Sequence, residues 1–172
     1  MSEDNILSKG LSNRPHILAI EDEIAIARLL PRMLGTLGYE ATVVGSAQEV
    51  RELLDASYGM AASAIKGGSA LGTAAGVQGL LAMAAGTEPK GPQYAAVFLD
   101  NDCPYARGGS EVQDCGYGLA LFIQETYIGL PVGLTSGRDN PQGNTTVPFL
   151  QKPYKRGDLE SFLAKLVSDR HE

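Results

Sequence analysis

The sequence predicts an α/β protein in which short apolar strands alternate with amphipathic helices around a parallel sheet. Residues 95–99 (AAVFL) are uniformly apolar, as expected of a strand that is buried on both faces. Residues 16–20 (HILAI) form a second run of this kind, and apolar residues at helical spacing follow it. Because this alternation recurs along the chain, we expect right-handed βαβ units and a doubly wound parallel sheet.

Composition and charge indicate a single domain and argue against some classes of function. The chain has 172 residues, 44% of them hydrophobic, which suffices for one well-buried domain but not for two. The formal net charge of −6, without any run of Lys or Arg, argues against direct binding to nucleic acid or to an anionic membrane. No stretch is long and apolar enough to span a bilayer, and no signal peptide is evident. We therefore expect a cytoplasmic protein whose Cys103 and Cys115 are free thiols.

The first part of the chain predicts a tail and a helix. Residues 1–14 are polar, and we expect a flexible N-terminal tail. Residues 24–37 carry an apolar stripe at helical spacing, and Gly38 is the expected residue at the helix C-terminus. Pro31 lies inside this helix, where it should cause a kink or loosen one turn.

A strand, a capped helix and an insertion come next. Residues 41–44 are expected to form a short strand, and Ser46 with Glu49 makes a capping box for the following helix. Residues 56–93 are rich in glycine and alanine and contain few large apolar side chains. We interpret this segment as an insertion into a domain that spans residues 15–169.

After the central strand, Pro104 should stop the extended run, and residues 105–116 are expected to form a glycine-rich loop. A helix is then expected around Leu119, Leu121, Phe122 and Ile123. Residues 130–134 and 147–151 are predicted strands, the second at a sheet edge because it contains proline. Asp158 is the expected N-cap of a last helix, with apolar residues on one face: Leu159, Phe162, Leu163 and Leu166.

Polar residues suited to chemistry follow the carboxyl ends of these strands. They are Glu21, Asp22, Asp100, Asp102, Thr135 and Lys152. The carboxyl ends of the strands in open α/β sheets are where ligands bind, so we expect these side chains to converge. Clustered carboxylates suit Mg²⁺, and a lysine and a hydroxyl can stabilise a phosphoryl group during transfer. In this chemistry Asp100 would be the nucleophile.

Four short motifs resemble the receiver (response-regulator) family of two-component signalling. The motifs are Ile-Glu21-Asp22-Glu, Leu-Asp100-Asn-Asp-Cys-Pro104, Leu-Thr135-Ser-Gly and Gln-Lys152-Pro153. Their order and their placement after strands match the family over residues 15 to 168. The resemblance implies a flavodoxin-like fold with five parallel strands in the order 2-1-3-4-5.

The resemblance also implies a role for each of these residues. By it, Asp100 is the phospho-acceptor, and Glu21 and Asp22 form the acidic metal site together with Asp100 and the backbone carbonyl of Asp102. The expected ion is Mg²⁺, with Mn²⁺ as a possible substitute. Thr135 is similar to the switch hydroxyl of the family and Lys152 to its phosphate-binding lysine. Phe149 matches the switch aromatic, although simple packing at the sheet edge would also explain it, and the Lys152-Pro153 bond is expected to be cis.

Two departures from the family pattern are evident. The insertion at residues 56–93 separates the second helix from the third strand, which are ordinarily close together in sequence. The segment between Thr135 and Lys152 is too short for a full fourth helix, and residues 138–146 are polar and contain Pro141. We therefore expect that helix to be shortened or missing, which puts in doubt the face that family members commonly use to dimerise.

The resulting hypothesis is a signalling module of bacterial type rather than an enzyme acting on other molecules. It would take a phosphoryl group from a sensor histidine kinase or a histidine phosphotransfer protein, hold it as an aspartyl phosphate, and signal to a downstream protein target. A homodimer is compatible with this function. One alternative is a phosphatase of the haloacid-dehalogenase type that uses Asp100 and Asp102, although that motif normally follows the first strand. A module that only docks partners is the other alternative.

Overall fold

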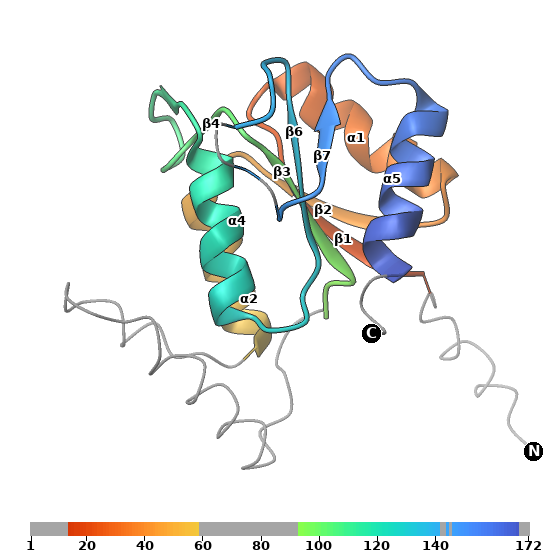
Figure 1. Cartoon of the computed structure of the whole chain (residues 1–172), viewed down its shortest axis with the longest axis horizontal. Helices are drawn as coiled ribbons and strands as arrows, with labels where there is room; N and C mark the ends of the chain where they lie inside the picture. Colours follow the sequence, from red (N-terminus) through yellow and green to blue (C-terminus); the bar gives the residue numbers. More distant parts are fainter. Residues whose placement is uncertain (1–13, 59–92, 142–143, 145, 169–172) are drawn as a thin grey trace, which may run out of the picture.

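The computed structural model describes residues 14–58, 93–141, 144 and 146–168. Within them the chain forms one five-stranded sheet flanked by helices (Figure 1). The expected N-terminal tail and most of the expected insertion lie outside the described residues. The described start of that insertion, residues 56–58, is helical and completes α2.

The central sheet confirms the predicted parallel topology. Its strand order is β2-β1-β3-β6-β7, and all four neighbouring pairs are parallel. The strands are β1 (His16–Ile20), β2 (Glu40–Val44), β3 (Ala96–Asp100), β6 (Val132–Ser136) and β7 (Phe149–Gln151). Counted along the chain, this is the predicted order 2-1-3-4-5. β3 lies at the centre and is buried along its whole length, as its uniformly apolar sequence predicts.

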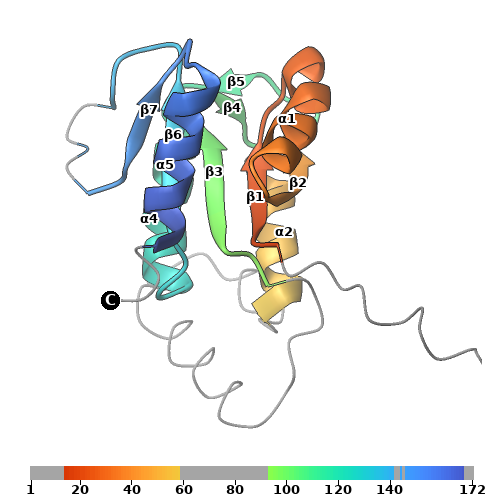
Figure 2. The ribbon, with the colours of Figure 1, turned by 90° about the vertical axis from the view of Figure 1, so that its right-hand side faces the viewer.

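Helices cover both faces of the sheet, as expected of a doubly wound fold (Figures 1 and 2). α1 (Ile24–Thr36) and α5 (Arg156–Ser168) lie on one face, and α2 (Ala47–Tyr58) and α4 (Cys115–Thr126) lie on the other. Alternate residues of β3 serve the two cores. Phe98 packs with Leu34 and Leu163 on the α1/α5 side, whereas Leu99 packs with Leu54 and others on the α2/α4 side.

Helix boundaries agree with part of the sequence analysis. Gly38 has a φ of 90° just after α1, which is the left-handed conformation that favours glycine. α1 runs unbroken from Ile24 to Thr36 with Pro31 inside it, so the proline does not end the helix. Ser46 and Glu49 pair at the start of α2 in a variant of the predicted capping box: the Glu49 backbone N–H donates to Ser46 Oγ at 3.4 Å, and Ser46 Oγ donates to the Glu49 carboxylate at 2.9 Å. Glu49 also accepts from the backbone of Gly45 at 3.1 Å.

The start of α5 corrects the prediction for Asp158. α5 begins at Arg156, so Asp158 lies in the first turn rather than at the N-cap. Its carboxylate reaches back and accepts a hydrogen bond from the backbone N–H of Lys155 at 2.8 Å. An acidic residue three positions after the N-cap can accept from the backbone N–H of the N-cap residue in this way. The sequence pattern alone does not distinguish such a residue from the N-cap residue.

The segment after β3 is more ordered than the predicted loop. β4 (Cys103–Pro104) pairs antiparallel with β5 (Glu111–Val112) in a separate two-stranded sheet. Pro104 therefore does not end the extended conformation. Proline has no backbone N–H to donate, and a position in a short, isolated two-stranded pair does not require one. The Gln48 backbone N–H donates to the carbonyl of Tyr105 at 2.8 Å, which attaches this segment to the start of α2.

The connection from β6 to β7 agrees with the expected loss of the fourth helix. Its described residues, 137–141, 144 and 146–148, contain no helix. Asn144 organises a turn there, because its side chain accepts from the Val147 N–H and donates to the Val147 carbonyl, both at 2.9 Å. β7 is an edge strand, as predicted, although it begins after Pro148 rather than before it.

The first turn of α4 packs directly on the backbone at the end of β3. The Gly116 N–H donates to the carbonyl of Asn101 at 3.0 Å, and a Cβ atom on Gly116 would lie 2.7 Å from Asn101 Cα. Only glycine permits this approach. The helix is thereby held against the residue that follows Asp100.

We expect Gly116→Ala to lower the free energy of unfolding by about 2–3 kcal/mol, because the added methyl group forces backbone apart. Gly118→Ala is the matched control on the same helix, since a Cβ there meets nothing within 4 Å. It should be neutral or stabilising by up to about 1 kcal/mol. Urea denaturation measures both, and equal stability of the two variants would contradict the close packing at Gly116.

Candidate functional site

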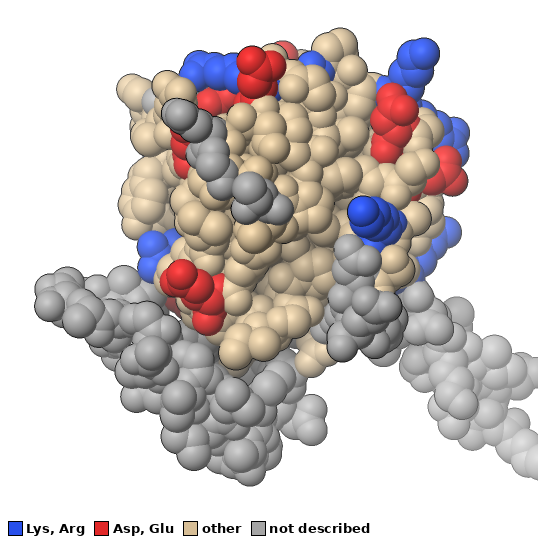
Figure 3. Space-filling view, in the orientation of Figure 1, with Lys and Arg blue, Asp and Glu red and all other residues tan. Residues whose placement is uncertain are grey.

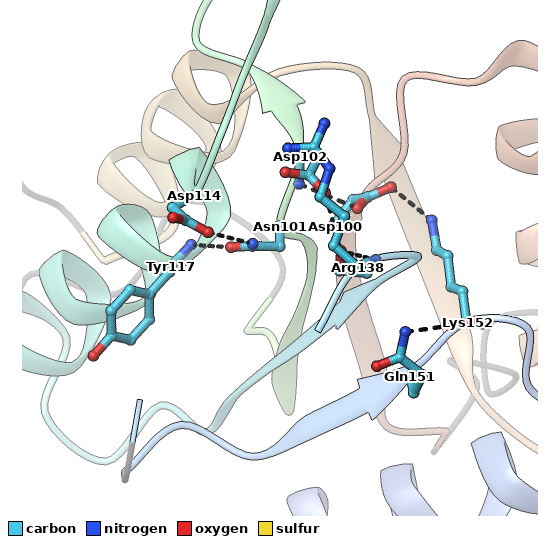
Figure 4. Close-up of polar contacts among 9 residues, drawn as sticks. Asp100, Asn101, Asp102, Asp114, Tyr117, Arg138, Gln151 and Lys152 are labelled. Atoms are coloured by element: carbon cyan, nitrogen blue, oxygen red, sulfur yellow. Dashed lines mark hydrogen bonds and ion pairs between the residues drawn. The ribbon is translucent and has the colours of Figure 1, made fainter. Parts of the chain in front are cut away.

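The site is built around Asp100, the last residue of the central strand. Its side chain is buried, with 7% of the residue exposed. Lys152 Nζ lies 2.6 Å from Asp100 Oδ2 (Figure 4) and 3.1 Å from Glu21 Oε2, so one lysine links the carboxylate at the end of β3 with the one just after β1. The other Asp100 oxygen, Oδ1, accepts from the backbone N–H of Asp102 at 3.3 Å. The parallel sheet thus brings together side chains that are far apart in the sequence.

An acidic group at this edge fits a hard divalent cation. Glu21, Asp22 and Asp100 each offer a carboxylate oxygen, and these oxygens lie within 4.8 Å of one another. The three carboxylates and Lys152 carry a formal charge of −3 + 1 = −2 when all are ionised. Mg²⁺ favours oxygen ligands from one or two carboxylates together with water, and the open hollow lined by these residues leaves room for water. The residues present therefore fit the ion that the sequence analysis expects.

Burial and charge shift the pKa values of this group in a consistent pattern. Burial raises the pKa of Asp100 and of Glu21, and Lys152 opposes both shifts. Burial alone would lower the pKa of Lys152, but hydrogen bonds and charge from Asp100 and Glu21 outweigh it and raise the pKa overall. Lys152 therefore stays protonated at neutral pH, and its single positive charge offsets only part of the negative charge of the three carboxylates.

Thr135 lies beside Asp100 on the adjacent strand, and the two residues are paired in register. The Thr135 hydroxyl is buried and has no hydrogen-bond partner among the described residues. A buried hydroxyl without a partner is uncommon and costs free energy. It is a donor available to an incoming group.

The side chain of Asp102 lines the same hollow, and Ser136 and Arg138 contact it. Its Oδ2 accepts from Ser136 Oγ at 3.0 Å and lies 3.5 Å from Nε of Arg138. Ser136 Oγ in turn accepts from the Arg138 backbone N–H at 2.9 Å. Arg138 thus offsets the charge of the Asp102 side chain. The backbone carbonyl of Asp102 remains the predicted metal ligand. The sequence analysis assigned no role to Ser136 or Arg138.

Asn101 fixes the strand end from the opposite side (Figure 4). Its side chain donates to Asp114 Oδ1 at 2.8 Å and accepts from the Tyr117 N–H at 3.0 Å. Asn101 is almost completely buried, and Asp114 has a φ of 57° in the left-handed region. Sequence analysis missed this contact because Asp114 lies in a segment whose glycines predict only a loop.

The remaining predicted positions lie near the site at the sheet edge. Phe149 is half-buried on β7 and packs against the α2/α4 core, and its role in switching stays a prediction. The Lys152-Pro153 bond is cis, as predicted. Figure 3 shows basic and acidic side chains mixed along the upper edge, whereas the middle of the visible face is largely uncharged.

Solved structures with the same fold are consistently receiver domains. A sensor protein from Polaromonas sp. JS666 matches with a TM-score of 0.56 and 22% identity, covering 91% of this chain and 98% of that one. A response regulator receiver protein from Sinorhizobium medicae WSM419 matches with a TM-score of 0.58 and 16% identity, covering 92% and 98%. The receiver domain of a sensor histidine kinase from Pseudomonas aeruginosa PAO1, solved with magnesium coordinated in its active-site cleft, matches with a TM-score of 0.55 and 20% identity, covering 90% and 98%.

These likenesses show that the chain has the receiver-domain fold. Neither protein-family models nor curated protein sequences gave a match. Among the described residues, no helix has the length and apolar character needed to cross a membrane.

We expect Asp100→Asn to raise the free energy of unfolding by about 1 kcal/mol at neutral pH in a metal chelator. The change removes a buried charge from a cluster with excess negative charge, and Lys152 keeps Glu21 as its partner. Asp139→Asn, at an exposed position, is the control and should leave stability unchanged. Chemical denaturation provides the measurement.

The same comparison has a defined pH dependence. Because the pKa of Asp100 is raised in the folded protein, its ionised form destabilises the fold above that pKa. Acidification from neutral pH through the raised pKa values of Asp100 and Glu21 should therefore stabilise the wild type more than Asp100→Asn. The difference in the free energy of unfolding between the two proteins should then become smaller. Excess Mg²⁺ should also narrow or reverse it. A difference that stays constant across pH and metal concentration would show that the carboxylates do not interact.

Proposed function

We propose that this chain is a phospho-accepting receiver domain of two-component signalling, with Asp100 as the phospho-acceptor. One observation carries the proposal: Asp100 is buried at the end of the central strand, in contact with Lys152 and within an oxygen cluster formed with Glu21 and Asp22. This arrangement supplies a nucleophile, a cation and a set of metal ligands at one point. The receiver-domain fold supports the same assignment.

The proposed reaction transfers a phosphoryl group from a histidine of a sensor kinase or of a phosphotransfer protein. An oxygen of Asp100 forms a bond to phosphorus while the bond from phosphorus to the donor's imidazole nitrogen breaks. Glu21, Asp22, Asp100 and the backbone carbonyl of Asp102 would hold Mg²⁺, whose charge would offset that of the phosphoryl oxygens. Lys152 pairs with a further oxygen, and its existing contact with Asp100 places its charge where the group arrives.

Thr135 and Phe149 are the proposed switch. The buried hydroxyl of Thr135, which has no hydrogen-bond partner within the described part of the chain, can donate to the phosphoryl group. Thr135 lies on β6 and Phe149 lies on β7, and these two strands are paired. A displacement of Thr135 therefore moves the backbone that carries Phe149. The altered β7 edge would then be recognised by a downstream protein target or by a second copy of the chain. We place this module in the cytoplasm.

The phosphatase alternative is not favoured. Asp100 ends the third strand along the chain rather than the first, and the acidic pair Glu21 and Asp22 directly follows β1. The solved structures with this fold are receiver domains.

With acetyl phosphate and Mg²⁺, we expect the wild type to gain the mass of one phosphoryl group. The reason is that Asp100 already lies in contact with Lys152 and beside the carboxylates of Glu21 and Asp22. Asp100→Asn should gain none, whereas the control Asp139→Asn should be labelled like the wild type. Intact-mass spectrometry with and without a metal chelator measures the gain. Equal labelling of Asp100→Asn, or labelling that persists in chelator, would contradict the assignment.

Thr135→Ala should still accept a phosphoryl group at Asp100 but should lose most of the structural response at β7. The reason is that alanine lacks the hydroxyl that the phosphoryl group would draw toward itself. Thr135→Ser keeps the hydroxyl and serves as the matched control. Amide NMR shifts of residues 149–151 before and after phosphorylation are the measurement, and a full response in Thr135→Ala would assign the switch elsewhere.

A further inference from the structure

The hollow that Asp100 lines is strongly acidic. It has a volume of about 310 Å³, and five carboxylates line it together with a single lysine. The carboxylates belong to Glu21, Asp22, Glu23, Asp100 and Asp102. Lys152 already contacts two of them, Asp100 and Glu21, and its side chain is only 20% exposed. A phosphoryl group that enters the hollow therefore meets an excess of negative charge, of which a bound divalent ion would offset only part.

A second cation, Arg138, lies at the edge of this hollow (Figure 4). Its neighbour in sequence, Gly137, lines the hollow, and Arg138 Nε lies 3.5 Å from Oδ2 of Asp102. The Arg138 side chain is 58% exposed, so of the two cations it is the one that an anion from solvent reaches first. Within the described part of the chain, the guanidinium makes this ion pair and donates no hydrogen bond. Since the ion pair is longer than a charge-assisted hydrogen bond, the guanidinium N–H groups remain available to a ligand.

Hydrogen bonds fix the backbone of Arg138 while its side chain stays exposed. The Arg138 backbone N–H donates to Ser136 Oγ at 2.9 Å, and Ser136 Oγ donates to Asp102 Oδ2 at 3.0 Å. Ser136 is completely buried at the end of β6, so the start of the following connection is anchored in the sheet. A guanidinium on such an anchor is suited to bind a phosphoryl group, because its planar set of N–H donors matches two phosphoryl oxygens at once.

We propose that Arg138 binds the phosphoryl group of the incoming donor and guides it past the carboxylates toward Asp100. The proposal rests on the proposed function, in which Asp100 is the acceptor. Before the donor arrives, Asp102 holds the guanidinium at the edge of the hollow. A phosphoryl group carries more negative charge and more acceptor oxygens than the Asp102 carboxylate, which Ser136 also contacts. Arg138 therefore exchanges Asp102 for the donor, and the ligand class of this position is a phosphoryl dianion.

Binding can be separated from transfer with acetylphosphonate, an analogue of acetyl phosphate in which a phosphorus–carbon bond prevents transfer. When the analogue is added to the whole chain with Mg²⁺, the side-chain Nε–Hε resonance of Arg138 should shift in a saturable manner. The same resonance of Arg32, an exposed residue of α1 that does not line the hollow, is the control and should not move. Absence of a shift at Arg138 would overturn the proposal, whether or not Asp100 accepts a phosphoryl group.

The rate of phosphorylation by acetyl phosphate and Mg²⁺ is the second measurement. Arg138→Ala should lower the rate at low donor concentration by about tenfold, as expected when a charge-assisted hydrogen bond is lost at an exposed position. Arg138→Lys should keep part of the rate, since lysine retains the charge but lacks the planar set of donors. Arg32→Ala changes the net charge equally and should behave like the wild type. A rate in Arg138→Ala equal to that of the wild type would overturn the proposal.

The alternative is that Arg138 acts only by neutralising Asp102, and a double substitution separates the two roles. Asp102→Asn removes that charge and keeps the backbone carbonyl. If Arg138 contacts the donor, adding Arg138→Ala to Asp102→Asn should again lower the rate by about tenfold. A loss that disappears in the Asp102→Asn background would overturn the proposal. A wild type that takes up no phosphoryl group would contradict the proposed function, while the Arg138 resonance still decides whether this residue binds the analogue.

Discussion

The ion pair between Lys152 and the buried carboxylate of Asp100 is the interaction on which the rest of the site depends. A carboxylate that is only 7% exposed at a strand end is costly to ionise unless a cation offsets it. Lys152 supplies that cation from the far edge of the sheet and also pairs with Glu21. The remaining excess of negative charge is what a bound divalent ion would offset.

The surrounding fold holds Asp100 at fixed backbone positions. Thr135 and Asp100 are in register on neighbouring strands, and the Asn101 N–H donates to the Thr135 carbonyl at 2.8 Å. On the other side, Gly116 brings the first turn of α4 against Asn101. These contacts come from α4 on one side and from β6 on the other, so both elements fix the backbone beside Asp100.

The sequence predicts the sheet and most of the site because both depend on local pattern and on simple topological rules. Uniformly apolar runs identify buried strands, and parallel strands place Glu21, Asp100 and Lys152 at one edge. The contacts missed by this reasoning are those between side chains and loops. Asp114 reaches Asn101 only because of a left-handed backbone turn, and Arg138 offsets Asp102 only because Ser136 turns the connection after β6 toward it. The position of Asp158 in the first turn of α5 likewise depends on where the helix starts, which propensity leaves uncertain by a few residues.

The central claim is that the Asp100 carboxylate itself receives the phosphoryl group. Borohydride reduction tests this most directly, because it converts an aspartyl phosphate to homoserine while leaving a free carboxylate unchanged. After treatment with acetyl phosphate and Mg²⁺, peptide mass spectrometry should find homoserine at position 100 and at no other aspartate. Homoserine at Asp22 or Asp102, or its absence from position 100 in a protein that carries a phosphoryl group, would contradict the account.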